Sequence, residues 1–237
     1  MKKAEIDSLT LGADPELILH KNGQIAPANQ YFNSSDEFGC DGNSTVAELR
    51  PKSSKTPLGL VSYIAQLIDW AHQEYPDLKM MAGAMAFDHA IGGHIHLSTP
   101  ASPNKLNNLD LLIGTLEDHI YPSTDIQRRR SNGYGALTSF RRKNYGIEYR
   151  TPVSWLTTPV IALVYLTLAK LAVVNDETNI AEEITNKEQG LKVLRNIKKY
   201  LPIIPEDCEM GIGYIEEVLD TPISKWGDDI VPHWKED

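Results

Sequence analysis

The stretch Gly92-Gly93-His94-Ile95-His96-Leu97 decides the fold that this sequence predicts. In a β-strand, successive side chains point to opposite faces of the sheet. His94 and His96 therefore lie on one face of a strand, and Ile95 and Leu97 lie on the other. The apolar face suits a core, whereas two imidazoles on one face indicate a strand that also serves a functional site.

Three other short segments place charged side chains on one strand face in the same way. Ile147-Glu148-Tyr149-Arg150-Thr151 puts Glu148 and Arg150 together, and Ala47-Glu48-Leu49-Arg50-Pro51 repeats that spacing. Asp14-Pro15-Glu16 carries two carboxylates two positions apart. Carboxylates and imidazoles beside arginines are typical of hard-metal ligands surrounded by anion-binding groups. We therefore interpret the four segments as parts of one cluster.

Some of these segments also have a structural interpretation when taken alone. Paired strand histidines are often half-buried and hydrogen-bonded, and Asp14-Pro15-Glu16 is often a turn at a strand start. Glu48 and Glu148 are harder to explain in that way, because burying a Glu–Arg pair gains little once both charges lose water. Oxygen donors outnumber the two histidines, which favours Mg²⁺ or Mn²⁺ over zinc.

Length and composition predict one globular domain over residues 1–237. The chain is 41% hydrophobic and 23% charged, and its apolar runs stay below the roughly 18 residues of a membrane span. The net charge of −9 argues against nucleic acid as the main partner. Because no apolar stretch follows Lys2 and Lys3, a signal peptide is not expected. We expect a cytoplasmic protein without a membrane partner.

The apolar pattern and the turn signals predict an α+β fold with a mostly antiparallel sheet. Lys21-Asn22-Gly23 is typical of a hairpin turn, and residues 29–43 indicate a loop. Strands are expected over residues 9–11, 16–20, 44–50, 78–87, 91–98 and 146–150. The motif-bearing sheet region then spans about residues 8–155.

Helices are expected beside the sheet and throughout a helical C-terminal part of about residues 156–237. Their predicted ranges are 57–75, a segment ending at 120, 159–174, 184–200 and 211–219. The helix from Pro159 is apolar on nearly every side, which indicates burial in the core or at a subunit contact. The sequence leaves the oligomeric state open.

Six of the 23 basic residues fall between Arg128 and Lys143. They form the two runs Arg128-Arg129-Arg130 and Arg141-Arg142-Lys143. An isolated run of this kind is usually a solvated loop or an RNA contact. Because these runs come directly before Glu148 and Arg150, we interpret them as phosphate-binding instead.

The four motifs, in this order, resemble those of a known ligase family. Gly12-Ala13-Asp14-Pro15-Glu16, Ala47-Glu48-Leu49-Arg50-Pro51, Gly92-Gly93-His94-Ile95-His96 and Tyr145-Gly146-Ile147-Glu148-Tyr149-Arg150 resemble the phage-encoded COOH-NH2 ligase type 2 group. That group belongs to the glutamine synthetase and glutamate–cysteine ligase superfamily. The resemblance spans roughly residues 10–155. It implies a glutamine synthetase-like catalytic domain whose antiparallel sheet holds ATP and divalent ions, Mg²⁺ or Mn²⁺.

The resemblance also implies a role for each motif residue. The metal ligands would be Asp14, Glu16, Glu48, His94 and Glu148. The catalytic set would be Glu148, which bridges toward the transferred phosphate, with Arg150 and Arg50. The nucleotide would be bound by His96, Arg130, Arg141 and Arg142, and both members of the Arg141-Arg142 pair remain candidates for the ATP phosphates.

The expected activity is an ATP- and Mg²⁺-dependent ligation of a carboxylate to an amine through an acyl phosphate. The acid and the amine are not identified, and a small molecule, a peptide or a protein would each fit. If the chain is phage-encoded, it would act in the cytoplasm of the infected host cell. The alternatives are a carboxylate or guanidino phosphotransferase on the same scaffold, a catalytically idle virion or binding protein, and a metal-dependent hydrolase.

Overall fold

The computed structural model describes residues 1–42, 45–221, 223 and 229–235, and their fold is α+β. Within these residues, eight strands form one sheet in which neighbouring strands run antiparallel. They are β1 (Leu11–Lys21), β2 (Gln24–Ile25), β3 (Phe38–Cys40), β4 (Val46–Leu49), β5 (Lys79–Met81), β8 (Gly93–Leu97), β9 (Phe140–Lys143) and β10 (Gly146–Tyr149). The separate hairpin consists of β6 (Met85–Ala86) and β7 (His89–Ala90). The predicted fold class is confirmed.

The order of the strands puts the motif-bearing segments next to each other. It is β3-β4-β1-β8-β10-β9, and β2 and β5 pair with β1 outside this path. The first motif lies on β1, the second on β4, the histidines on β8, and Glu148 on β10. The four motifs therefore meet on neighbouring strands, although they are spread over more than half of the chain.

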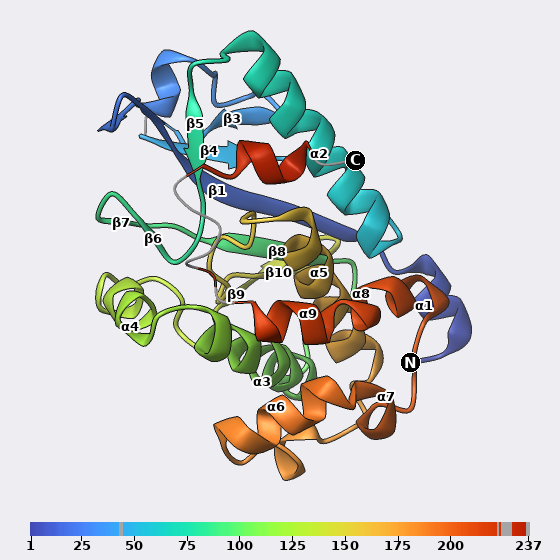
Figure 1. The fold of residues 1–237 in the computed structure, drawn as a ribbon. Coiled ribbons are helices and arrows are strands. Elements are labelled where there is room, and N and C mark those ends of the chain that lie inside the picture. Colours follow the sequence, from blue (N-terminus) through green and yellow to red (C-terminus); the bar gives the residue numbers. More distant parts are fainter. Residues whose placement is uncertain (43–44, 222, 224–228, 236–237) are drawn as a thin grey trace.

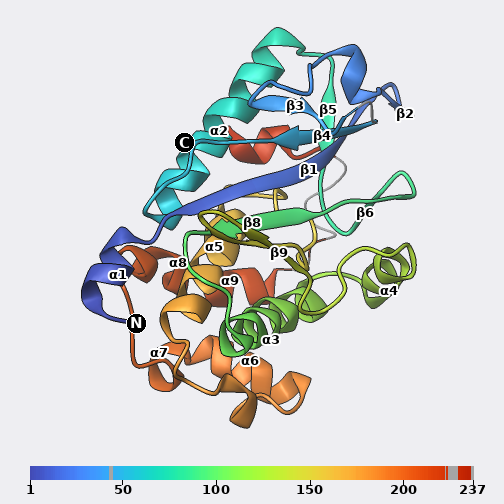
Figure 2. The same cartoon turned by 180° about the vertical axis from the view of Figure 1, so that it is seen from behind.

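The helices pack against the sheet and against one another. They are α1 (Lys3–Ser8), α2 (Pro57–Glu74), α3 (Pro103–Ile120), α4 (Ser123–Ser131), α5 (Pro159–Val174), α6 (Lys187–Arg195), α7 (Ile197–Tyr200), α8 (Glu209–Gly213) and α9 (Ile215–Asp220), with 3-10 helices at Ala28–Gln30, Ile180–Glu182, Glu206–Cys208 and Val231–Trp234. In Figure 1 α5 lies in front of the sheet, and from behind β1 and β8 lie in front of α5 (Figure 2). The opposite face of β1 and β8 is thus available to the polar side chains.

The core lies between the sheet and the long helices. The side chains of Leu17, Ile95 and Ile147 pack with those of α2, α3 and α5 in one buried cluster. Every residue of α5 from Ile161 to Val174 is buried. Of the two interpretations of this apolar helix, the structure supports burial in the core of its own chain.

The three long helices begin in the same way, with a capping hydroxyl followed by proline. Thr56 accepts a hydrogen bond from the amide of Gly59, and Ser102 and Thr158 cap α3 and α5 likewise. A serine or threonine cap satisfies an amide that the first turn leaves free, and proline has no amide to satisfy. These signals explain why the starts predicted at Pro57 and Pro159 are confirmed.

Three strand predictions are wrong in their boundaries. Residues 9–11 and 16–20 do not form separate strands, because β1 runs without a break through Pro15. Proline cannot donate a hydrogen bond to a neighbouring strand, and Pro15 stands at the last residue pair between β1 and β8, opposite Gly93. The predicted strand over 78–87 is divided between β5 and β6.

Several other segments also differ from the prediction. The described part of the loop predicted over 29–43 contains β3, which is too short to show an alternating pattern. The strand predicted over 44–50 is confirmed as β4, and its first residue lies outside the described residues. Arg128, Arg129 and Arg130 belong to α4, a helix that was not predicted from the sequence. Residues 184–200 are divided between α6 and α7, and residues 211–219 between α8 and α9.

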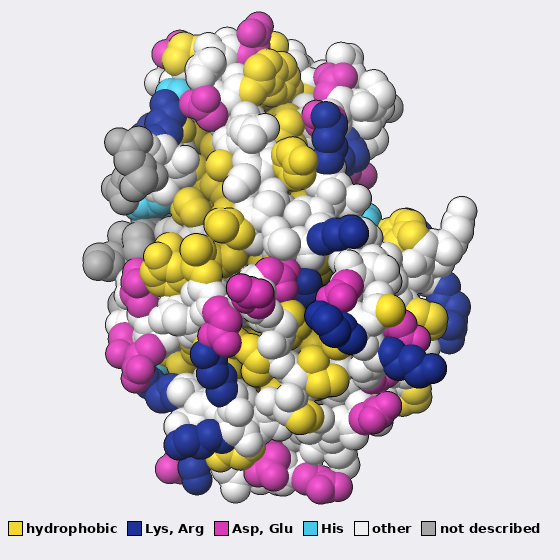
Figure 3. Space-filling view, turned by 90° about the vertical axis from the view of Figure 1, so that its right-hand side faces the viewer, with side chains coloured by type: hydrophobic (Ala, Val, Ile, Leu, Met, Phe, Trp, Pro, Cys, Tyr) yellow, Lys and Arg dark blue, Asp and Glu magenta, His cyan; other side chains and the backbone are white. Residues whose placement is uncertain are grey.

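The surface of the described residues is mixed in character. On the side shown in Figure 3, acidic and basic side chains are interspersed, so this side has no large patch of one sign. Each helix that the structure describes is too short or too polar to cross a lipid bilayer.

Candidate active site

The register of the sheet brings the predicted site residues together on one face. Asp14 stands directly opposite His94, and Glu148 stands opposite His96. Glu16 stands opposite Glu48 in the pairing of β1 with β4. Because directly opposed residues share a face, one polar face is built from all four motifs.

Glycines make room for this arrangement. A Cβ on Gly93 would lie 2.3 Å from the carbonyl oxygen of Val153 and 2.5 Å from the ring of Trp155. The segment that follows Arg150 therefore crosses directly against β8, and Trp155 donates a hydrogen bond to the Gly93 carbonyl at 2.9 Å.

Asp14 lies between the two histidines. Its Oδ1 atom is 3.2 Å from Nδ1 of His94 and 3.2 Å from Nε2 of His96. Burial alone would raise the pKa of Asp14, but its contacts with the two imidazoles hold that pKa well below its usual range. Asp14 is therefore an anion at neutral pH, as a carboxylate has to be when it ligates a metal ion.

Glu148 is buried and lies close to three cationic side chains. Its side chain is only 2% exposed, yet Lys143 Nζ lies 2.7 Å from Oε2. Arg150 Nε lies 3.2 Å and Arg141 Nη1 lies 3.7 Å from Oε1. One carboxylate thus meets three cationic side chains, and their charge exceeds its own.

Three of the predicted ligands fit a divalent ion. Among the described residues, one possible ligand atom from each of Asp14, His94 and Glu148 lies within 4.8 Å of the others. Asp14 Oδ1, His94 Nδ1 and Glu148 Oε2 are all buried, and none makes an aligned hydrogen bond within the described residues. Buried polar atoms left in this state indicate a missing partner. Two carboxylates and an imidazole would hold Mg²⁺ or Mn²⁺.

Glu16 and Glu48 lie beside this trio and have other partners. Glu16 Oε2 accepts a hydrogen bond from the Gly92 amide at 2.6 Å, and burial raises the pKa of Glu16. Glu48 forms an ion pair with Arg50. Burial and the neighbouring Asp14 charge raise the pKa of Glu48 to about 7. The structure brings both carboxylates to the polar face without placing them in the group of three.

Arg50 holds a loop in addition to lining the site. Its guanidinium donates hydrogen bonds to the carbonyl oxygens of Asp36 at 3.1 Å and Cys40 at 3.3 Å. With Glu48 on β4 as its third partner, the guanidinium binds groups on β3, on β4 and in the segment before β3. Arg50 thus has three partners within its own chain, and its predicted catalytic role stays a prediction.

The predicted nucleotide-binding arginines separate into two groups. Arg141 stands opposite Glu148 on the polar face, whereas Arg142 stands opposite Ile147 and its guanidinium lies over the ring of Phe140. Arg130 lines a different cavity of about 410 Å³, beside Asp110. Of the three, the structure places only Arg141 with the cluster and does not bring Arg130 or Arg142 to it.

A cavity of about 400 Å³ opens beside the cluster. Its walls include Asp14, His96, Arg50 and the hydroxyls of Ser53 and Ser98. Tyr145 also lines it and stacks on His96, with ring centroids 5.7 Å apart. The cavity offers charged, hydroxyl and aromatic groups next to the metal-binding trio, which suits a small polar ligand.

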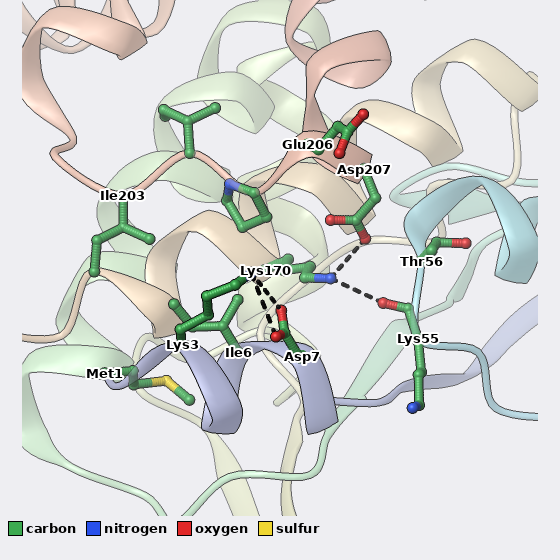
Figure 4. A pocket seen from close by; sticks show the side chains of 12 residues that line it. Met1, Lys3, Ile6, Asp7, Lys55, Thr56, Lys170, Ile203, Glu206 and Asp207 are labelled. Atoms are coloured by element: carbon green, nitrogen blue, oxygen red, sulfur yellow. Dashed lines mark hydrogen bonds and ion pairs between the residues drawn. The ribbon is translucent and has the colours of Figure 1, made fainter.

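A larger cavity, of about 740 Å³, lies elsewhere and contains none of the predicted site residues. As Figure 4 shows, Lys170 reaches Asp207 at 2.6 Å and the Lys55 carbonyl at 2.9 Å. Lys170 is the one charged residue of α5 and is buried. These bonds satisfy the buried ammonium, so the lysine ties α5 to its neighbours and we assign no chemistry to this cavity.

Sequence reasoning missed three side chains that build the site. Lys143 was part of the basic run but was not separated from it, although a strand over 140–143 places it on the face of Arg141. Tyr145 lies in the turn between β9 and β10 and carried no charge to mark it. Arg129 is buried and donates to the carbonyls of Ile91, Thr151 and Pro152 at 2.7–2.8 Å. It fastens α4 to the segments beside β8 and β10.

Comparison with known proteins identifies a family for the chain. No curated protein matches the chain. A family model described as "Phage phiEco32-like COOH.NH2 ligase-type 2" matches residues 11–198, which include all four motifs and both basic runs. A family of this description consists of ligases that join a carboxylate to an amine. The match covers well over half of the 237 residues, so the chain belongs to the phage phiEco32-like COOH-NH2 ligase type 2 family.

Proposed function

We propose that this chain is an ATP- and Mg²⁺-dependent carboxylate–amine ligase that works through an acyl phosphate. The observation that carries the proposal is the position of Glu148. Asp14 and His94 lie close to it as possible metal ligands, and Arg141, Lys143 and Arg150 form ion pairs with it. A divalent ion and several cationic side chains at one site can together neutralise the charge of a transferred phosphoryl group.

The proposed reaction has two steps. An oxygen of the acid attacks the γ-phosphorus of ATP, so that an O–P bond forms and the bond to ADP breaks. The amine nitrogen then attacks the acyl carbon, so that the amide forms, phosphate leaves and the amine gives up a proton. A bound divalent ion would neutralise phosphate charge next to Glu148.

The residues of the chain have separate tasks in this scheme. Asp14, His94 and Glu148 would hold the ion, and Arg141 and Arg150 would orient the transferred phosphoryl group. His96 and Tyr145 line the adjacent cavity, where a substrate group would lie against their stacked rings. Glu16 and Glu48 lie beside the trio, and Arg50 would hold Glu48 and the backbone at Asp36 and Cys40 in place.

Nucleotide-dependent stabilisation of the wild type and of Glu148→Gln tests this proposal. A ligand that binds only the folded state at a hundredfold excess over its dissociation constant raises stability by about 2.7 kcal/mol. We expect ATP with Mg²⁺ to raise the melting temperature of the wild type and to leave Glu148→Gln nearly unchanged. Glu188→Gln, an exposed change on α6, is the matched control. Equal shifts in all three proteins would contradict the proposal.

Product analysis then separates the ligase from its alternatives. ADP and an amide identify the ligase. A phosphorylated acid that persists in the presence of amines identifies a phosphotransferase, and turnover without ATP identifies a hydrolase.

A further inference from the structure

Lys143 makes the shortest contact that Glu148 has with a cation. It lies on β9, the edge strand beyond β10, and shares the polar face with Arg141. Its Nζ atom is 2.7 Å from Oε2 of Glu148. The carboxylate is 2% exposed, whereas the lysine side chain is 37% exposed. The ammonium therefore reaches in from a surface position and can leave without unfolding its strand.

The carboxylate that Lys143 contacts belongs to the trio that fits a divalent ion. Mg²⁺ coordinates oxygen at about 2.0–2.1 Å, so an ion on Glu148 and an ammonium on the same carboxylate repel each other at close range. Lys143 and the ion thus compete for Glu148. Lysine carries a point charge on a flexible four-carbon stem, which allows its ammonium to move while Cα stays fixed.

The neighbours of Lys143 indicate where its ammonium goes. Arg141 and Arg150 lie on the same side of Glu148 at 3.7 and 3.2 Å, so this side is rich in positive charge. A displaced ammonium in this positive region is stabilised best when it lies next to a bound anion. In the proposed reaction the anion nearest to Glu148 is the transferred phosphoryl group.

We propose that Lys143 is a further catalytic residue, an inference that rests on the proposed ligase function. Lys143 neutralises Glu148 before the ion binds and moves to the oxygens of the transferred phosphoryl group when ion and nucleotide are in place. It stabilises the charge that spreads over these oxygens and transfers no proton. Arg142, its neighbour on the opposite face, has no such role.

Metal affinity tests the competition without any need for turnover. Mn²⁺ binding is measured by electron paramagnetic resonance, without nucleotide, for wild type, Lys143→Met and Arg142→Met. Both variants lose one positive charge from adjacent positions of β9, but only Lys143 contacts Glu148. We expect Lys143→Met to bind Mn²⁺ about two- to tenfold more tightly than Arg142→Met. Equal or weaker binding would overturn the inference.

Turnover tests the second half of the inference. Lys143→Met should lower kcat by about a hundredfold while the KM for the acid stays close to that of the wild type. Lys143→Arg should recover part of kcat because it restores the charge, whereas a merely structural role would not depend on charge. Wild-type kcat in Lys143→Met would contradict the phosphoryl contact.

Two further outcomes keep this inference distinct from the proposed function. If the wild type makes no product with ATP, the proposed function fails and the phosphoryl contact fails with it, but the Mn²⁺ comparison still decides the competition for Glu148. If Lys143→Met does not fold, Lys143→Gln replaces it, because its shorter neutral side chain remains polar at a half-exposed site. A Gln variant that binds Mn²⁺ no more tightly than Arg142→Met overturns the inference equally.

Discussion

At the scale of single residues, the carboxylates of the polar face differ in pKa because their surroundings differ. Asp14 lies against two imidazoles that lower its pKa, whereas burial raises the pKa of Glu16 and Glu48. The anion that the imidazoles stabilise is also the one that belongs to the group of three possible ligands. Neighbouring carboxylates on one face can therefore have different tasks.

This division predicts unequal effects on metal binding. Asp14→Asn should weaken Mn²⁺ binding by at least about tenfold, because an amide is a poor replacement for an anionic ligand. Glu48→Gln should weaken it by less than about threefold, since Glu48 is paired with Arg50 outside the trio. Isothermal titration calorimetry of Mn²⁺ binding to both variants tests this difference. A larger loss in Glu48→Gln would show that Glu48 ligates the ion directly.

The pKa of the Glu117 carboxyl, which lies outside the site, predicts how stability depends on pH. Glu117 is fully buried on α3, and burial raises its pKa from 4.5 to about 7. The folded protein thus holds this proton more tightly than the unfolded chain does. The free energy of unfolding should therefore fall as the pH rises from about 4.5 to about 7, by up to about 3 kcal/mol for this group alone.

Replacing Glu117 tests the sign of this dependence. Gln can still accept the hydrogen bond that the Val153 amide donates at 2.9 Å. In urea unfolding at pH 5 and pH 8, Glu117→Gln should lose less stability than the wild type between the two values. The exposed substitution Glu188→Gln should follow the wild type. A fall in Glu117→Gln that equals or exceeds that of the wild type would mean that Glu117 is already ionised in the folded protein at pH 5.

At the scale of elements, the site depends on how closely β8 and the segment after β10 approach. Gly93→Ala would place a methyl group 2.3 Å from the Val153 carbonyl. We expect a destabilisation of about 1–3 kcal/mol, because the crossing segment has to move away. Gly114, in the middle of α3, has open space around its Cβ position, and Gly114→Ala should stabilise by about 0.5–1 kcal/mol. Thermal unfolding of the two variants compares them directly, and similar shifts would contradict the close approach.

The same scale shows how far sequence reasoning reaches. Alternation was sufficient to put His94 with His96 and Glu148 with Arg150 on common faces, because it depends only on neighbouring residues. It could also have selected Arg141 over Arg142, had the four-residue strand β9 been expected. Residue pairing between strands is different, because Asp14 and His94 are 80 positions apart and their pairing is fixed by packing over the whole sheet.

At the scale of the molecule, the helical layer and the polar face of the sheet serve separate purposes. Caps and apolar periodicity predicted α2 and α5, and these helices hold the apolar side of β1, β8 and β10 in place. The single-domain expectation over residues 1–237 stays a prediction. Arg129 is an example of what a sequence does not reveal: within a basic run it is the buried member, because α4 docks against the ends of two strands.

Transfer of ¹⁸O from the acid to phosphate is the most direct test of the claim that the chain is an acyl-phosphate ligase. The protein is incubated with ATP, Mg²⁺, acids labelled with ¹⁸O in their carboxylates and a set of amines, and the released phosphate is analysed by mass spectrometry. An acyl-phosphate ligase transfers one ¹⁸O from acid to phosphate for each amide formed, and this transfer should be lost in Glu148→Gln. Release of unlabelled phosphate, or an amide formed without ADP, would contradict the account.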